Sequence, residues 1–547
     1  MTSKLKAGKA AYAAIIFLFI ILFIYGISNT KEYGRSWDEP YAVFILESNW
    51  VEYAQRLFPE GSAPRNWADE PGIIPISVNF EKDHGCAPYY AFIPLYKMFH
   101  DDKAALVYAW HSYTFCLFFL SVIVVFFLLY EIYGSFPISV AGMLFYFFTP
   151  RFFGEGHFND KDIVFMGLVM TCMLFAIRAA KKLALRKNAR ADIIFFCMAS
   201  GFMMNVKIIG IAIWGLTGIF TIVYLLTRQE KKNPKAIVNI IIAVILSLLF
   251  YILLTPASWA GVTDFFKYLF HNAVHYEEWD SSLRFRGTLF RPAEIGMPMS
   301  YLPIWMLITI PVYITVLFIS SVIVFVIRSI REKGKNLLKE NSDLFFLMLL
   351  IGFSAPFCFV VLKSHSMILY NSWRHLYFLY AFMLPGTLYL PHLLINKYLN
   401  DHSRKNKAIL VFVSAFTAIS FLFCAGEMIL NRSYEYVYYN ALSRQITDVN
   451  GYEGDYWMVS VIPAINEFAD IYYDGGRPLK VGCLLFEVHG IEDGMFDDKK
   501  VVITSPEDAD YLVFNPSGSY DWLEIDDHEK LFSINRFGVE LSGIYAK

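Results

Sequence analysis

Long apolar stretches recur along most of this 547-residue chain, and they constrain its fold more than any other feature. A helix needs about 20 predominantly apolar residues to cross a bilayer. The hydrophobic share of 56% and the mean hydropathy of +0.43 exceed ordinary values for a soluble globular chain. We therefore expect a polytopic α-helical membrane protein with about eleven spans, at residues 10–27, 105–130, 136–150, 163–180, 191–204, 207–226, 236–254, 301–327, 343–362, 374–395 and 408–430.

Composition argues against several other classes of protein. The net charge of -2 provides no basic field for nucleic acid, so no nucleic-acid partner is expected. Most of the seven cysteines fall inside apolar runs and none forms a CxxC pair, which argues against a disulfide framework or a zinc knuckle. The first apolar run follows Lys4, Lys6 and Lys9 and lacks a small-residue cleavage site. It is therefore interpreted as an uncleaved first span.

The distribution of basic residues predicts the orientation in the cell membrane. If the N-terminus is cytoplasmic, alternate loops are expected to be rich in lysine and arginine. Four such loops occur in the expected alternation: Arg178–Arg190, Arg228–Lys235, Arg328–Lys339 and Lys397–Lys407. Only an odd number of spans satisfies this pattern, so the C-terminus is expected outside the cytoplasm. The opposite loops, including the long segments 28–104 and 255–300, then face out and hold many polar side chains.

Composition also predicts two domains. Residues 1–430 carry the apolar stretches and the outer loop 28–104, whereas residues 431–547 have a soluble pattern. Apolar runs at Lys480–Phe486, Tyr511–Phe514 and Lys530–Ala546 alternate with turn residues. This pattern is typical of a small α/β domain, with a closing hairpin around Phe537. We expect this domain to be extracytoplasmic.

The sharpest local motif is Arg35-Ser36-Trp37-Asp38-Glu39-Pro40, directly after the first span. Proline suits the first turn of a helix. The following apolar residues form one stripe, which predicts an amphipathic helix in the membrane interface: Val43, Leu46, Trp50, Ala54 and Leu57. Asp38 or Glu39 is then either a helix N-cap or a functional carboxylate, and both roles are compatible.

Two further outer segments concentrate polar groups. The loop Thr149–Asp162 places several ionisable side chains between two apolar spans, where they must face water or each other. An ordinary solvated loop is the alternative interpretation. In Tyr370–His375, Arg374 and His375 enter the next span at the same outer level. Arginine there either snorkels to the surface or binds phosphate as a planar fork.

Together these segments resemble the bacterial relatives of the dolichyl-phosphate-mannose protein mannosyltransferases and the lipid A aminoarabinose transferase, which are GT-C-fold glycosyltransferases. The Lys-Pro-Pro segment of the aminoarabinose branch is absent, and Lys82-Asp83-His84-Gly85 stands there instead. The resemblance therefore names neither the sugar nor the acceptor. It rests on Asp38-Glu39, Pro150-Arg151-Phe152-Phe153, Asn159, Lys161-Asp162, Trp373-Arg374-His375, Tyr434–Asn440 and Asp455-Tyr456-Trp457.

The resemblance implies a membrane glycosyltransferase that moves a sugar from a polyprenyl-phosphate donor to a protein, glycan or lipid acceptor at the outer face. It implies that Asp38 is the catalytic base, and we expect Glu39 to orient it or contact the sugar. A phosphate leaving group needs no strong general acid, unlike the alkoxide in glycoside hydrolysis. One displacement would invert the anomeric carbon. The expected donor-binding residues are Arg374, Arg151, Lys82, Lys161, Asp162 and His375.

Three alternatives remain open at this point. No cofactor is certain, although a divalent cation held by residues of the outer loops is a minority hypothesis; its candidate ligands are Glu81, His84, His271 and His275. A lipid-linked glycan ligase or polymerase would use the same outer loops. A transporter or flippase would place ionisable groups or broken helices near the bilayer midplane, often in two symmetric halves. The sequence shows no such repeat.

Overall fold

The computed structural model describes residues 8–68, 72–228, 234–274, 282–332, 341–363, 369–483, 494–517 and 528–547. Within these ranges, nine helical segments are long and apolar enough to cross a membrane, which confirms the predicted polytopic helical fold. They are α1 (Lys9–Ile27), α5 (Lys103–Tyr133), α8 (Asp162–Ala184), α10 (Ile209–Arg228), α11 (Pro234–Leu254), α15 (Val312–Arg331), α16 (Asn341–Lys363), α17 (Phe378–Thr387) continued by α18 (Tyr389–Asn400), and α19 (Arg404–Leu430).

The predicted number of about eleven spans differs from the nine long segments for a local reason. The stretches at 136–150 and 191–204 form shorter helices, α6 (Phe136–Phe147, 12 residues) and α9 (Arg190–Val206, 17 residues). The predicted span 301–327 is also broken, into α14 (Tyr301–Thr309) and α15. Pro311 causes this break, because proline lacks an N–H and forces the residue before it into an extended conformation.

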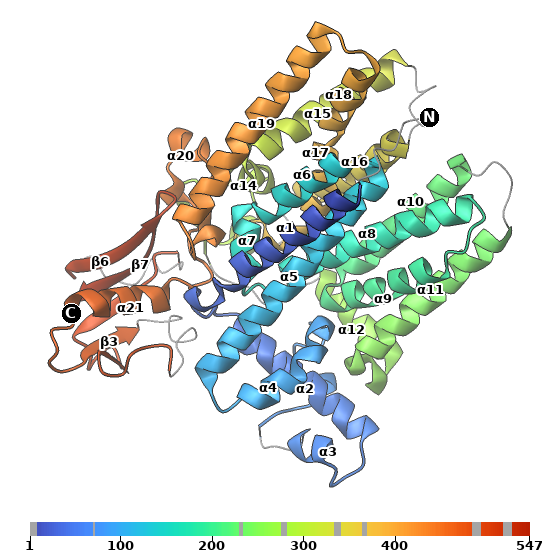
Figure 1. Cartoon of the computed structure of the whole chain (residues 1–547). Coiled ribbons are helices and arrows are strands. Elements are labelled where there is room, and N and C mark those ends of the chain that lie inside the picture. The colour runs from blue at the N-terminus through green and yellow to red at the C-terminus, as the bar shows by residue number, and fades with distance from the viewer. Residues whose placement is uncertain are drawn as a thin grey trace.

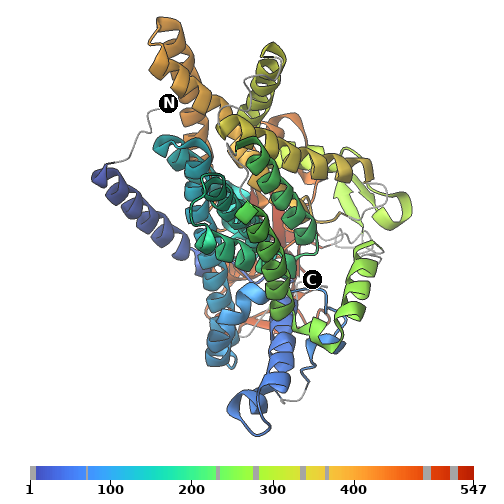
Figure 2. The ribbon, with the colours of Figure 1, turned by 90° about the vertical axis from the view of Figure 1, so that its right-hand side faces the viewer.

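The long helices form one bundle with α8 at its centre (Figure 1). This helix packs against α5, α9, α10 and α17, and 78% of its apolar window is buried. By contrast, only 11% of the windows of α11 and α19 is buried. Isoleucine, leucine and phenylalanine side chains cover their outer surfaces. Such surfaces are expected against lipid rather than water. Figure 2 shows α1 at the edge of the bundle, where 17% of its window is buried.

Helices of the long outer loops gather at the end of the bundle away from the N-terminus (Figures 1 and 2). The predicted interfacial helix is α2 (Glu39–Leu57), and Leu46 and Ala54 of its apolar stripe are buried as expected. Leu57, at the end of the stripe, is 61% exposed. The other helices at this end are α3 (Ala63–Ala68), α4 (Ile93–Phe99) and α12 (Val262–Val274), and the second long loop also contains the short α13 (Pro292–Ile295).

Short elements connect the bundle to the rest of the chain. The α-helices are α7 (Pro150–Glu155) and α20 (Ser443–Ile446), and β1 (Leu283–Phe285) pairs with β2 (Thr288–Phe290). The 3-10 helices are η1 (Thr30–Glu32), η2 (Ile76–Val78), η3 (Ala87–Phe92), η4 (Pro256–Ala260), η6 (Arg374–Leu376), η7 (Glu435–Val437) and η8 (Val449–Gly451).

The C-terminal part contains a five-stranded mixed sheet, as the predicted α/β pattern requires (Figure 1). The strands β3 (Leu479–Cys483), β4 (Val501–Thr504), β5 (Tyr511–Phe514), β6 (Lys530–Arg536) and β7 (Val539–Ala546) lie in the order β4-β3-β5-β7-β6. Helix α21 (Val461–Tyr472) packs on the sheet through Phe468. Phe537 and Gly538 both have positive φ, as a two-residue hairpin turn requires. They form the predicted closing hairpin between β6 and β7.

The segment between α19 and α21 packs into the helical bundle. Tyr436, Tyr439, Tyr456 and Trp457 are buried in the same apolar core as α5 and α8. Tyr33, near the end of α1, donates from its hydroxyl to Glu435 Oε2 at 2.7 Å. This segment therefore packs at the end of the bundle where α1 ends, next to the loops that carry the candidate site.

Candidate active site

Asp38 and Arg374 form an ion pair although 336 positions separate them in the sequence. Arg374 Nη1 donates to Asp38 Oδ2 at 2.8 Å, and the guanidinium lies 4.4 Å from the centre of the Trp457 ring. Burial lowers the pKa of Arg374, but Asp38 and its neighbours outweigh this effect and hold the pKa well above its ordinary value. The Asp38 side chain remains 31% exposed, so a ligand can reach the carboxylate.

Arg374 follows a tight turn just before α17. Asn371 and Ser372 have positive φ values of 55° and 63°, which are uncommon for residues other than glycine. The backbone N–H of Ser372 donates to Glu453 Oε2 at 2.9 Å, and Glu453 is buried. Residues in such conformations persist when their surroundings fix them. The turn therefore sets the position from which Arg374 reaches Asp38.

The loop that carries Asp38 is fixed by the segment after α19. Trp37 N donates to Trp457 O at 3.2 Å. Gly34 approaches so closely that a Cβ there would lie 2.3 Å from Val459 O, which a side chain cannot tolerate. Asp38 occupies the N-cap position of α2, but its side chain makes no cap hydrogen bond. The carboxylate is thus used for the ion pair and not for the helix end.

Glu39 is held inside the protein. It is 2% exposed, and its Oε2 accepts from the backbone N–H of Ser36 at 2.5 Å. Its Oε1 lies 2.8 Å from Nε2 of His111, a buried residue of α5. Both carboxylate oxygens therefore have protein partners that fix the start of α2. In the sequence, His111 stands in a largely apolar stretch, and no pattern there identifies it as the partner of Glu39.

In the second outer loop, Asp162 is held by protein groups on both sides. Its backbone N–H donates to Asn159 Oδ1 at 2.8 Å, and Asn159 Nδ2 donates to Glu155 Oε2 at 2.7 Å. Its carboxylate pairs with Lys207, at the turn between α9 and α10. Burial lowers the pKa of Lys207 although Asp162 opposes this effect. Asp162 is therefore already compensated by a cation of the protein.

Lys161 connects the second outer loop electrostatically to Asp38. Burial lowers the pKa of Lys161, but Asp160, Asp38 and Glu81 outweigh it and raise the pKa above its ordinary value. Burial raises the pKa of Asp160 to about 7, and Asp38 acts in the same direction. These interactions indicate that Lys161 and Asp160 belong to the electrostatic surroundings of Asp38. Sequence reasoning did not select Asp160, although it stands beside Lys161 in the motif.

Arg151 and His375 lie in places less suited to binding a phosphate. Arg151 is 1% exposed, and its Nη2 donates to the carbonyl oxygen of Tyr438 at 3.2 Å. The ring of His375 packs edge-on against that of Tyr370, 4.5 Å away. Burial and three nearby cations lower the pKa of His375 well below its ordinary value although Asp162 opposes them, so the ring is neutral at pH 7. Arg151 is therefore held inside the protein by the Tyr438 carbonyl, and His375 carries no positive charge.

Lys82 contacts α12. Its Nζ lies 4.1 Å from the centre of the Tyr268 ring, and the Tyr268 hydroxyl donates to Phe80 O at 2.7 Å. Cation–π contacts of this kind anchor a lysine without neutralising it. Lys82 of the first long loop is therefore held against the second long loop.

The residues of the minority metal hypothesis are not all placed. His84 Nδ1 lies 2.5 Å from Glu81 Oε2, and His271 is exposed on α12. His275 lies outside the described residues. Among the residues that are described, no group of three or more His, Cys, Asp or Glu side chains could hold a metal ion. The pair of His84 and Glu81 supplies two ligands, fewer than the three that protein metal sites commonly provide.

The arrangement around Asp38 has a defined chemical capacity. One partly exposed carboxylate is ion-paired with a buried arginine and electrostatically coupled to a lysine from another loop. The carboxylate can accept a proton from a hydroxyl group. The two cations can stabilise a phosphate oxyanion, because arginine binds such groups in a bidentate manner. All three groups belong to the outer-loop end of the bundle.

Comparisons with known proteins give structural similarities only. No protein-family model and no curated protein matches the sequence. The structure resembles that of ArnT from Cupriavidus metallidurans in the apo state, with 11% identity, a TM-score of 0.45 and 98% of each chain covered. ArnT bound to undecaprenyl phosphate gives 12% identity and a TM-score of 0.45, over 99% of this chain and 98% of that chain. The archaeal oligosaccharyltransferase AglB from Archaeoglobus fulgidus, in complex with an inhibitory peptide and a dolichol-phosphate, gives 10% identity and a TM-score of 0.47. This match covers 91% of this chain and 69% of that chain.

Proposed function

We propose that the protein is a membrane glycosyltransferase that moves a sugar from a polyprenyl-phosphate donor to a hydroxyl-bearing acceptor. The observation that carries the proposal is the Asp38–Arg374 pair at 2.8 Å, with Lys161 electrostatically coupled to the same carboxylate. A base beside two phosphate-binding cations is what this transfer requires. The motif resemblance set out for the sequence supports the same function.

In the proposed reaction, the acceptor oxygen attacks the anomeric carbon of the donor sugar while Asp38 takes the proton of the attacking hydroxyl. The bond between the anomeric carbon and the phosphate oxygen breaks, and its electrons leave with the lipid phosphate. Arg374 and Lys161 stabilise the negative charge that develops on this phosphate. A single displacement inverts the anomeric carbon. No protein group has to protonate the leaving oxygen, since a phosphate is a weak base.

We assign supporting roles to the other predicted residues. Glu39 anchors the start of α2 through His111 and thereby positions Asp38. Arg151 and Asp162 fix the second outer loop from inside the protein, and Lys82, held against the Tyr268 ring, stays a further candidate phosphate ligand from the first loop. These assignments leave Arg374 and Lys161 as the main donor-phosphate ligands.

The proposal places the site on the outer side of the cell membrane. Lys181 pairs with Glu131, and Lys182 with Asp192, at the opposite end of α5 and α8 from Asp38. Basic residues are typical of the cytoplasmic side. Residues 1–430 would then form the catalytic membrane domain, and residues 431–547 an extracytoplasmic domain that covers its outer face.

A transporter is less well supported by the positions of the charges. Among the described residues, the ion pairs of the long helices lie near helix ends, as in Arg328–Asp343 and Lys207–Asp162. Transporters of the inverted-repeat type instead place binding groups near the middle of the bilayer, at broken helices. The positions of these pairs therefore favour chemistry at one membrane surface.

The proposed function is tested by comparing cells with and without the protein. We expect loss of the gene to remove one sugar from an envelope glycan, a lipid or a protein, with accumulation of its polyprenyl-phosphate donor. Mass spectrometry of lipids and released glycans would detect both changes and identify the acceptor class. Unchanged glycans, lipids and proteins, with no donor accumulation, would contradict the proposal.

A further inference from the structure

Glu453 is a buried carboxylate that the proposed mechanism does not use. It lies in the segment between α19 and α21 and is 3% exposed. Burial raises its pKa from 4.5 to about 7, although the Ser372 backbone, the Tyr301 hydroxyl and the nearby Arg374 guanidinium oppose this effect. A buried carboxylate is costly unless hydrogen bonds compensate it. Its partners therefore indicate what it stabilises.

The carboxylate of Glu453 binds the turn that precedes Arg374. Its Oε2 accepts from the backbone N–H of Ser372 at 2.9 Å, and the backbone of Asn371 also hydrogen bonds to the carboxylate. Successive N–H groups of a turn can form a concave nest that binds an anion. Both turn residues have positive φ, which residues other than glycine seldom adopt. The carboxylate thus stabilises a conformation that is unfavourable for these two residues by themselves.

Glu453 is itself held at both its side chain and its backbone. The Tyr301 hydroxyl donates to Glu453 Oε2 at 3.2 Å, and the Tyr439 hydroxyl donates to the Glu453 carbonyl oxygen at 2.6 Å. Tyr301 begins α14, and both tyrosines are buried. The carboxylate therefore has a fixed position from which it can order the turn.

Other contacts hold the side chains around the turn. Trp373 Nε1 donates to Thr309 Oγ1 at 2.9 Å, and the hydroxyl oxygens of Ser372 and Tyr456 lie 3.3 Å apart. These bonds fix side chains, whereas the carboxylate binds the backbone of the turn. Without that carboxylate, we expect the protein to stay folded while the turn itself relaxes.

We propose that Glu453 is a positioning residue of the transfer reaction: it holds the turn at Asn371–Ser372 and thereby sets the Arg374 guanidinium for the donor phosphate. Glu453 contacts the turn and not the donor. The segment between α19 and α21 is then required for donor binding, rather than only covering the site. This assignment rests on the proposed function, because Glu453 acts through Arg374.

The kinetic test is a double-mutant cycle in the purified full-length protein. The assay is transfer from the best substrate in a panel of synthetic polyprenyl-phosphate pentoses and hexoses. Glu453→Gln keeps the size of the side chain but removes its charge, and it should lower kcat/KM about tenfold, mainly through the donor KM. In an Arg374→Ala background it should change kcat/KM by less than about twofold, because no guanidinium remains to be positioned. A purely structural role would give the same loss in both backgrounds.

A second measurement follows Arg374 directly and needs no transfer. In protein with isotope-labelled arginine, the NMR signal of the Arg374 Nε–H group is identified by its absence from Arg374→Lys. Glu453→Gln should shift or broaden this signal. Glu453→Asp keeps the charge but withdraws the carboxylate from the turn by one methylene group. It should therefore have the same effect on the signal and on kcat/KM.

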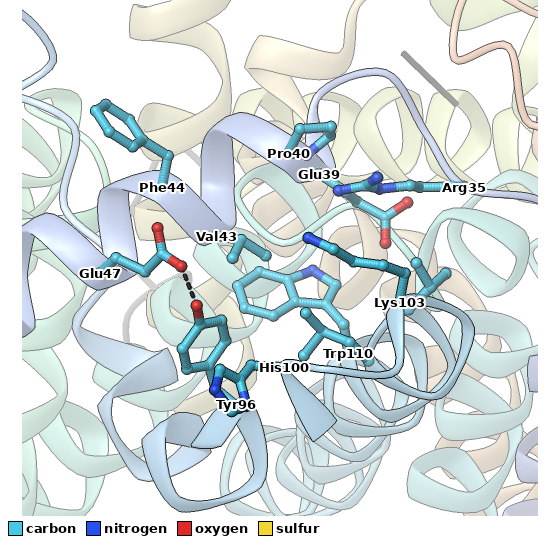
Figure 3. A pocket seen from close by; sticks show the side chains of 12 residues that line it. Arg35, Glu39, Pro40, Val43, Phe44, Glu47, Tyr96, His100, Lys103 and Trp110 are labelled. Carbon is cyan, nitrogen blue, oxygen red and sulfur yellow. Dashed lines mark hydrogen bonds between the residues drawn. The ribbon is translucent and has the colours of Figure 1, made fainter. Parts of the chain in front are cut away.

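Glu47→Gln is the matched control. Glu47 also accepts from a tyrosine hydroxyl, that of Tyr96, in a cavity lined by α2, α4 and the start of α5 (Figure 3). This variant should leave the Arg374 signal unchanged and kcat/KM within about twofold. The positioning role is overturned if Glu453→Gln leaves either the Arg374 signal or kcat/KM as in the wild type, or lowers kcat/KM equally in both backgrounds. Failure of the proposed function would appear separately, as no transfer by the wild type, and the Arg374 signal would then still decide whether Glu453 sets its position.

Discussion

Replacing Arg374 by lysine isolates the role of the guanidinium from that of its charge. Lysine keeps the positive charge but cannot bind a phosphate as a planar fork or lie flat 4.4 Å from the Trp457 ring centre. The lost charge-assisted hydrogen bond corresponds to about 1.5–3 kcal/mol. The lost cation–π contact contributes about 0.5–2 kcal/mol, and the new ammonium recovers part of both. We therefore expect a net loss of about 1–3 kcal/mol, or about 5- to 150-fold in kcat/KM.

The assay is sugar transfer from a panel of synthetic polyprenyl-phosphate pentoses and hexoses, with apparent donor KM and kcat measured for purified protein. Arg444→Lys is the matched control, because Arg444 also pairs with a carboxylate, that of Glu427, and lies 5.8 Å from the Phe537 ring centre. The control should leave kcat/KM within about twofold. Equal kinetics for Arg374→Lys and wild type, at matched yield and monodispersity, would remove Arg374 from the donor site.

Three further predictions concern topology, positioning and pH. A reporter fused after Lys547 should be active only if it functions outside the cytoplasm, and a cytoplasmic signal there would reverse the orientation. Glu39→Gln should lower transfer by less than about tenfold, because Glu39 positions α2 and moves no proton; a loss as large as that of Asp38→Asn would refute this role. Burial raises the pKa of Glu435 from 4.5 to about 8, so the folded state binds its proton more tightly than the unfolded state and thermal stability should fall as pH rises between these values. Glu435→Gln should flatten this pH dependence of the melting temperature, and an unchanged slope would contradict the assignment.

The sequence predicts the helical bundle well, because a backbone in lipid must satisfy its own hydrogen bonds and therefore forms helices. Apolar length alone does not give the ends of these helices. The stretch at 301–327 is apolar throughout, yet Pro311 divides it. The stretch at 191–204 forms a helix of only 17 residues, which ends at the buried turn before Lys207. Prolines and turns thus set the ends of the helices, which hydropathy alone does not predict.

The candidate site was only partly predictable. Asp38 and Arg374 each stand in a recognisable motif, but their contact joins residues 336 positions apart and depends on the packing of the whole bundle. The same holds for Trp457, whose ring covers the guanidinium. For Asp38 the sequence allowed both a helix cap and a functional carboxylate; the structure shows the cap position without a cap hydrogen bond.

Other parts of the site depend on burial, which a motif does not reveal. Arg151 follows a proline in an outer segment and looks like a phosphate ligand, yet it is 1% exposed. Asp160 looks like an ordinary loop residue, yet burial raises its pKa to about 7.

The central claim, that Asp38 is the base in a sugar transfer, is tested most directly by Asp38→Asn in the transfer assay. Because the Asp38 side chain makes no cap hydrogen bond, the substitution removes none, and the asparagine oxygen can still accept from Arg374. The variant should therefore fold and insert normally. An amide cannot take the proton of the acceptor, and base catalysis contributes roughly 100- to 10,000-fold. We predict a loss of transfer of that size at matched protein yield; transfer within a few fold of wild type would contradict the account.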